Sequence, residues 1–176
     1  YGRSGRCFGQ NARGTRHHRN PLHRSTRLPL LQRFLSEQPR FHPACIKEYP
    51  SIKVVLDLHR DAIERDNAVI SKPVIERDGE KYAQIMIISN CDDGSKLIPE
   101  WRENLRFAIA FTNKIEQKFE GLTRPILFSH RKYNQQLSTG ALLLEFGSIG
   151  NTLDEAKRSA VVVGEALAEL IESTRK

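Results

Sequence analysis

The chain has 176 residues and a formal net charge of +7 at pH 7, and its length fits one domain or part of one. Its longest apolar runs, residues 85–88 and 141–144, are far too short to span a membrane, and no signal peptide is recognisable. The three cysteines, Cys7, Cys45 and Cys91, are widely spaced and predict neither a zinc knuckle nor a disulfide framework. The chain begins with Tyr rather than Met, which favours a fragment.

The positive charge belongs to the first quarter of the chain. Residues 1–46 contain nine Arg, no Lys and one acid, Glu37, so they carry +8. Residues 47–176 contain 19 basic and 20 acidic residues and carry −1. Four prolines interrupt the first segment, which shows no sustained apolar periodicity, so we expect it to be irregular or disordered.

Three hypotheses account for residues 1–46. They form a basic arm that binds nucleic acid or another anionic polymer, or a transit-like leader, or the product of a reading-frame error. Arginine without lysine is typical of a wrong frame over GC-rich DNA, whereas residues 47–176 use ten Lys and nine Arg. We favour the frame error, which translation of the other two frames would test.

The first interpretable element is a strand within residues 51–61. Its Val- and Leu-rich start predicts a buried strand, covered on both faces. Strand periodicity places Val55, Asp57 and His59 on one face. The polar residues at its end lie where open α/β sheets bind ligands, so this strand predicts a functional site.

Further elements follow in order. Residues 74–82 predict a β-hairpin with Asp78-Gly79 at its turn, and residues 82–89 predict a buried strand followed by a polar loop. A helix is predicted from Pro99 to Gly121. Its expected buried stripe is Trp101, Leu105, Ala108, Thr112, Ile115 and Phe119.

The last part of the chain predicts two more strands and a helix. Residues 124–128 form a short strand, the loop 133–138 carries amides, and residues 141–147 form an apolar strand with the carboxylate of Glu145 near its end. Thr152 and Glu155 then form a capping box. The expected buried stripe of this helix is Leu153, Ala156, Ala160, Val163, Leu167 and Leu170. The order predicts an α/β fold, with a mixed, partly parallel sheet flanked by helices.

Four motifs in this order resemble the stage II sporulation protein P family, over residues 47–176 and not over residues 1–46. The motifs are Asp57-Leu58-His59-Arg60-Asp61-Ala62, residues 99–105, Tyr133-Asn134-Gln135 with Leu137-Ser138, and residues 143–147 continuing through 150–156. The family resembles the zinc-dependent N-acetylmuramoyl-L-alanine amidases. The resemblance implies an amidase-like domain that here lacks its N-terminal part.

The resemblance also implies roles for single residues. His59 matches the last zinc-ligand histidine, and Glu145 matches the catalytic glutamate. A catalytic zinc with an open position activates a water, and a nearby carboxylate moves that water's proton. We assign substrate binding to Asn134, Gln135 and Arg60, although loop amides also serve solubility alone.

The ligand set is incomplete in this sequence. The family's first zinc histidine and its glutamate ligand lie before the strand of residues 51–61, and nothing in residues 1–46 matches them. His17, His18 and His23 are interpreted as incidental. We therefore expect this chain to bind zinc poorly and to hydrolyse little. Asp57 and Asp61 are candidates for orienting His59, and the sequence does not decide between them and Arg60.

The resemblance implies an extracytoplasmic peptidoglycan hydrolase of sporulation and engulfment. It further implies endopeptidase action on peptide cross-links, a lytic transglycosylase partner, and a membrane anchor that is absent from this chain. The alternative function is a non-catalytic module that binds an anionic polymer through the Arg-rich arm. Because residues 47–176 carry −1, we expect no nucleic-acid partner.

Overall fold

A computed structural model defines residues 43–65, 69–91, 94 and 98–174 of the protein. The chain divides into two compact units, Tyr1–Ser51 and Ile52–Lys176. In the first unit the described part holds the short helix α2 (Pro43–Glu48), which starts with a proline as first helical turns allow. The prediction for residues 1–46 therefore falls almost entirely outside the described residues.

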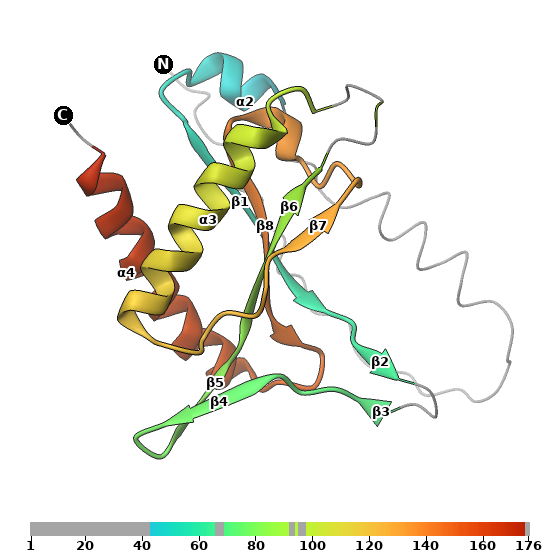
Figure 1. The fold of residues 1–176 in the computed structure, drawn as a ribbon, viewed down its shortest axis with the longest axis vertical. Helices are drawn as coiled ribbons and strands as arrows, with labels where there is room; N and C mark the ends of the chain where they lie inside the picture. The colour runs from blue at the N-terminus through green and yellow to red at the C-terminus, as the bar shows by residue number, and fades with distance from the viewer. Residues whose placement is uncertain (1–42, 66–68, 92–93, 95–97, 175–176) are drawn as a thin grey trace, which may run out of the picture. The chain divides into compact units, whose positions relative to one another are not determined.

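The second unit is built on a four-stranded sheet in the order β1-β8-β6-β7 (Figure 1). Its strands are β1 (Val54–Asp61), β6 (Ile85–Asn90), β7 (Leu127–Ser129) and β8 (Gly140–Ser148). β1 runs parallel to β8 and β7 parallel to β6, whereas β6 and β8 are antiparallel. The predicted mixed, partly parallel sheet is confirmed.

Two helices, α3 (Trp101–Lys118) and α4 (Leu153–Ser173), pack against each other and against one face of the sheet (Figure 1). The buried apolar side chains between them form a single core. They are Ala83, Ile85, Ile87, Ala108, Phe111, Ile115, Phe119, Leu122, Leu142, Leu144, Phe146, Ala156, Val163 and Ala166. None of the described helices is long and apolar enough to cross a membrane.

Half of the predicted buried stripe of α3 is confirmed, because Ala108, Ile115 and Phe119 are buried. The other predicted positions, Trp101, Leu105 and Thr112, are only half-buried. The observed stripe instead includes Phe111 and Asn104, and a stripe traced mainly through apolar residues did not predict a buried asparagine. The helix also begins two residues after Pro99, with Glu100 as its N-cap residue.

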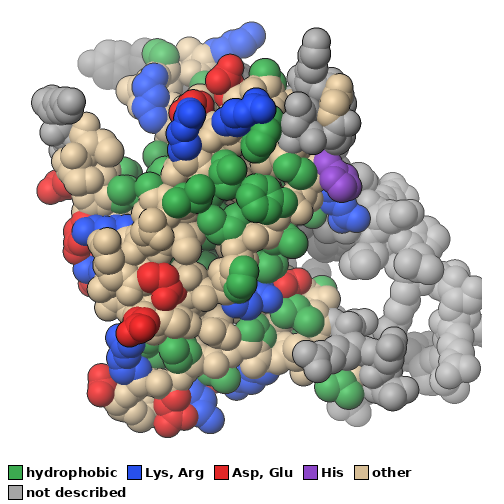
Figure 2. Space-filling view, in the orientation of Figure 1, with side chains coloured by type: hydrophobic (Ala, Val, Ile, Leu, Met, Phe, Trp, Pro, Cys, Tyr) green, Lys and Arg blue, Asp and Glu red, His purple; other side chains and the backbone are tan. Residues whose placement is uncertain are grey.

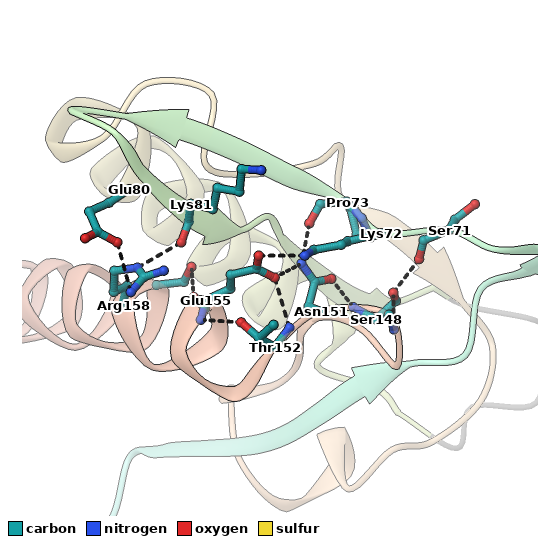
Figure 3. Close-up of polar contacts among 12 residues, drawn as sticks. Ser71, Lys72, Pro73, Glu80, Lys81, Ser148, Asn151, Thr152, Glu155 and Arg158 are labelled. Atoms are coloured by element: carbon teal, nitrogen blue, oxygen red, sulfur yellow. Dashed lines mark hydrogen bonds and ion pairs between the residues drawn. The ribbon is translucent and has the colours of Figure 1, made fainter.

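The capping box of α4 is confirmed. The hydroxyl of Thr152 accepts from the backbone N–H of Glu155, and the Glu155 carboxylate accepts from the N–H of Thr152. The same carboxylate lies 2.7 Å from Nζ of Lys72 (Figure 3). The start of α4 is thereby tied to the segment before β4. Two positions of its predicted stripe are wrong, because Leu153 and Ala160 are exposed.

Two hairpins and a short 3-10 helix, η1 (Gln135–Leu137), complete the described chain. β4 (Val74–Arg77) pairs with β5 (Glu80–Ala83), as predicted, and Asp78 and Gly79 take the positive φ angles of 53° and 77° that this tight turn requires. β2 (Glu64–Arg65) pairs with β3 (Val69–Ile70) in a segment for which no strand was predicted.

The expectation that β1 is covered on both faces is wrong. β1 lies at one edge of the sheet, and Leu58 on its helix-side face is 62% exposed. All nine residues of its neighbour β8 are buried.

Figure 2 shows hydrophobic side chains gathered near the edge of the sheet opposite β1, over β7 beside α3. The exposed large hydrophobic residues of these two elements are Ile109, Leu127 and Phe128.

Candidate active site

His59 and Glu145 lie side by side in the sheet. They are direct register partners across the parallel strands β1 and β8. Adjacent residues in register project to the same face, and their alternation with Leu58 and Leu144 places both on the face away from α3 and α4. The register slips just beyond them, because His59 pairs with Glu145 and Asp61 with Ser148. The pair thus lies next to a bulge, a feature common beside functional sites.

Glu145 carries a buried carboxyl group. The residue lies within β8 rather than at its end, and it is 8% exposed. Its Oε2 atom is buried and has no hydrogen-bond partner within the described part of the chain. Burial, with a smaller contribution from the negative charge of Asp61, raises the pKa of Glu145 to about 6. His59 and Arg124 oppose that rise.

Asp57 contacts His59. Both residues are on the same face of β1, and Oδ1 of Asp57 lies 3.0 Å from Nε2 of His59. The other carboxylate oxygen, Oδ2, accepts a hydrogen bond of 3.3 Å from the amide nitrogen of Asn134. Of the three neighbours that the sequence offered to orient His59, the structure brings Asp57 into contact.

Asp61 is paired with an arginine that the sequence analysis missed. Its Oδ2 atom lies 3.1 Å from Nη2 of Arg124, and both side chains are mostly buried. Arg124 follows α3 and precedes β7, where it hydrogen-bonds through its backbone N–H to the carbonyl of Ile85. An arginine before a proline carries no motif, so only the tertiary pairing reveals it.

Arg60 and Gln135 are engaged with backbone atoms. Nη2 of Arg60 donates to the carbonyl of Ser148, the last residue of β8, and to that of Asn151. Gln135 is 1% exposed, and its amide accepts from the N–H of Asn90 and donates to the carbonyl of Ile88. Their substrate-binding roles stay predictions, and a substrate group would have to compete with these bonds.

The donor set does not make a complete metal site. Among the described residues, no group of three or more His, Cys, Asp or Glu side chains is placed to hold a metal ion. His59 and Glu145 supply two groups of the right chemical type, but catalytic zinc takes three protein ligands. His17, His18 and His23 lie outside the described residues.

Comparison with known proteins supplies the family. The sequence profile of Stage II sporulation protein P (SpoIIP) matches residues 41–169. The chain belongs to the stage II sporulation protein P family. The profile covers β1, β8 and the whole of the site described above, so the resemblance seen in the four motifs is confirmed at the level of the family.

A curated relative agrees with this assignment. The chain is 26% identical over 125 residues to Stage II sporulation protein P of Bacillus subtilis (strain 168). The match covers 68% of this chain but 29% of that protein, so the chain spans less than a third of the length of this relative. No solved structure matches.

Proposed function

We propose that this member of the stage II sporulation protein P family carries part of the active site of a peptidoglycan amidase. The bond cut would be the amide between N-acetylmuramic acid and L-alanine. The observation that carries the proposal is Glu145, a buried carboxyl group with one unpartnered oxygen beside His59. A family name that belongs to sporulation supports the biological setting.

Glu145 is suited to move protons near neutral pH. With its pKa raised to about 6, it exists in both protonation states close to pH 6, as general acid–base groups do. Amide hydrolysis needs a base that takes a proton from water and an acid that returns it to the leaving amine. One carboxyl group with this pKa can do both steps in turn.

Zinc enters the proposal only with further ligands. His59 is the proposed zinc ligand, and Zn²⁺ bound by three protein groups would supply Lewis acidity toward the carbonyl. The described residues do not hold such a set. We therefore derive no step through the metal, and we propose that the chain as given binds zinc weakly.

The remaining assignments are part of the same proposal. Peptidoglycan is the polymer acted on, with endopeptidase action on cross-links as a second activity. A lytic transglycosylase would act beside it during engulfment, outside the cytoplasm and at the membrane. The anionic-polymer alternative depends on the Arg-rich segment, which lies outside the described residues.

Digestion of purified cell-wall sacculi tests the activity. The assay compares two proteins, each with and without added Zn²⁺. One is the chain itself, and the other, the extended form, has the in-frame upstream coding sequence restored before residue 47. Mass spectrometry should detect released stem peptides with a new free L-alanine amine in the extended form, and little release by the chain itself.

A matched pair of variants tests the assignment of Glu145. Glu145→Gln removes the titrating oxygen at constant size and should abolish release from the extended form. Glu120→Gln changes an exposed glutamate just after α3 and should leave release unchanged. Continued release by the Glu145→Gln protein, or release of sugars without free L-alanine amines, would refute the proposed function.

A further inference from the structure

The contact between Asp57 and His59 fixes where a hydrogen must lie. An ionised carboxylate only accepts hydrogen bonds, and a neutral imidazole has one donor nitrogen and one acceptor nitrogen. Oδ1 of Asp57 is 3.0 Å from Nε2 of His59. At that distance two lone pairs would repel, so the contact requires a hydrogen on Nε2. In the neutral imidazole Nδ1 then keeps the lone pair.

Asn134 occupies the second oxygen of the same carboxylate. Its Nδ2 atom donates to Oδ2 of Asp57 at 3.3 Å. With one oxygen facing His59 and the other facing Asn134, rotation of the carboxylate would cost contacts on both sides. The loop of residues 133–138 thereby reaches His59 through Asp57.

The backbone that presents Asn134 is strained. Tyr133 and Asn134 have φ angles of 41° and 60°, in the left-handed region. This region is unfavourable for a residue with a side chain, and asparagine tolerates it better than tyrosine does. Two such residues in succession persist only where the surrounding structure holds them, and such strain gathers at functional sites.

Hydrogen bonds on both sides of Asn134 hold this turn. Just after it, the Gln135 side chain is anchored to β6 through Asn90 and Ile88. Nδ2 of Asn104 on α3 donates to the carbonyl of Ser138, whose hydroxyl donates to the carbonyl of Lys53. On the other side of Asn134, before it in the chain, the carbonyl of Arg131 accepts from Nδ2 of Asn90. The turn is therefore built onto β6, α3 and the approach to β1.

We propose that Asn134 is a positioning residue that acts through Asp57 to hold His59 with its hydrogen on Nε2 and its lone pair on Nδ1. The role of His59 in this proposal rests on the proposed function. The contacts that link Asn134, Asp57 and His59 do not depend on that function. It differs from the substrate-binding role predicted for Asn134. A positioning amide stays on Asp57, whereas a substrate-binding amide would leave it.

NMR of the full 176-residue chain tests the proposal without any activity. An imidazole N–H held in a hydrogen bond exchanges slowly enough with water to be observed, and long-range ¹H–¹⁵N correlation identifies its nitrogen. The His59 signals are assigned by their loss in His59→Gln. We expect a proton on Nε2 of His59 in the unmodified chain.

Asn134→Gly is the deciding variant, because glycine adopts the left-handed backbone readily and the substitution removes the side-chain amide. It should speed exchange of the His59 Nε2 proton about tenfold, the effect of removing one supporting hydrogen bond to a charged group. Tyr133→Gly changes the neighbouring strained residue, leaves the amide in place, and should alter this exchange little.

Three results would overturn the proposal. They are a proton on Nδ1 of His59 in the unmodified chain, unchanged exchange in Asn134→Gly, and an equal effect of both glycine variants. In a peptidoglycan-active form, Asn134→Gly should lower kcat and leave KM unchanged, and a raised KM with unchanged kcat would instead favour substrate binding. If no form cleaves peptidoglycan, the proposed function fails while the NMR result still decides the role of Asn134.

Discussion

Glu145 lies directly across from His59 in the parallel register of β8 and β1, on the sheet face away from both helices. The two side chains come from strands separated by more than eighty residues of sequence, and the member on β8 is buried. The central strand therefore provides the low-polarity setting, and the edge strand provides the half-exposed imidazole. A carboxyl group that titrates near neutrality follows from that combination.

Ionisation of Glu145 should cost folding free energy. Its folded pKa is raised to about 6, from 4.5, so its contribution to stability is full below pH 4.5 and is lost as pH rises through about 6. A rise of that size corresponds to about 2 kcal/mol. Glu145→Gln should therefore gain about 2 kcal/mol over the unmodified chain between pH 4 and pH 8.

Urea unfolding of both proteins at pH 4, 6 and 8 measures this difference. Glu120→Gln, which removes an exposed carboxylate, should not reproduce the gain. A Glu145→Gln protein whose stability relative to the unmodified chain is the same at all three pH values would contradict the burial argument. Glu145→Gln should lose activity while gaining stability, because a buried ionisable group that serves catalysis lowers the stability of the fold.

Glu155 should have the opposite pH dependence. Burial alone would raise its pKa, but the contacts with Lys72, the N–H of Thr152 and Asn151 outweigh it and lower the pKa to about 2. Its stabilising contribution is present above pH 4.5 and is lost as the pH falls toward 2. Since Lys72 is partly exposed, solvent screening limits the contribution to roughly 2 kcal/mol.

Glu155→Gln should lower the free energy of unfolding by about that amount at pH 7 and by little at pH 2.5. Chemical denaturation at the two pH values gives the comparison. Glu165→Gln, on the exposed side of the same helix and 3.4 Å from Lys118, should change stability by less than about 0.5 kcal/mol. Equal losses at both pH values would show that packing, and not charge, explains the effect of Glu155.

Local sequence signals predicted those parts of the fold that short-range chemistry determines. The Thr152–Glu155 capping box and the Asp78–Gly79 turn are complete within four residues, so the sequence contains everything that fixes them. The apolar run of residues 141–147 likewise predicted a buried strand. Its position in the centre of the sheet depends on strand order, which no local pattern encodes.

The site was only partly predictable for the same reason. Asp57 and His59 share a strand, so their proximity follows from a period of two. Arg124 meets Asp61 through the arrangement of β6 and β7, and Asn104 is buried because a turn needs its amide. Both are long-range relationships between polar residues, which hydrophobic periodicity cannot reveal.

Gly147 should tolerate no side chain. It lies just after Phe146 with a φ of 65°, and an added Cβ would come within 2.4 Å of Oδ1 of Asn151 and 2.9 Å of Cβ of Ala83. The Asn151 oxygen is already held by the N–H of Ser148, so it cannot move freely. Gly147→Ala should cost at least about 2 kcal/mol, from backbone strain and overpacking together.

Gly164→Ala is the matched control, because an added Cβ there meets nothing within 4 Å and the residue lies inside α4. Alanine should leave stability unchanged or raise it by up to about 1 kcal/mol. Thermal unfolding of the two variants beside the unmodified chain measures both effects. A Gly147→Ala protein as stable as the Gly164→Ala protein would mean that the bulge can rearrange.

Asn104 should be the residue on which the turn of residues 133–138 depends most. It is fully buried, and its Nδ2 atom donates to the carbonyls of Ser138 at 2.9 Å and Ala141 at 2.8 Å. Asn104→Asp replaces this donor by an oxygen that faces both carbonyls. A carboxylate near a helix start gains about 0.3–1 kcal/mol from the helix dipole, but a buried charge without donors loses about 3 kcal/mol. Because the loss exceeds the gain, Asn104→Asp should lower the free energy of unfolding.

Hydrogen exchange measured by mass spectrometry would localise the damage. Peptides covering residues 131–138 should exchange faster in Asn104→Asp, while peptides from the centre of α4 should change less. Asn113→Asp makes the same chemical change at an exposed position of α3 and should leave the turn protected. Because the same turn carries Asn134 to Asp57, Asn104→Asp should also speed exchange of the His59 imidazole proton. Faster exchange in the turn with an unchanged His59 signal would separate the turn from the site and contradict their coupling.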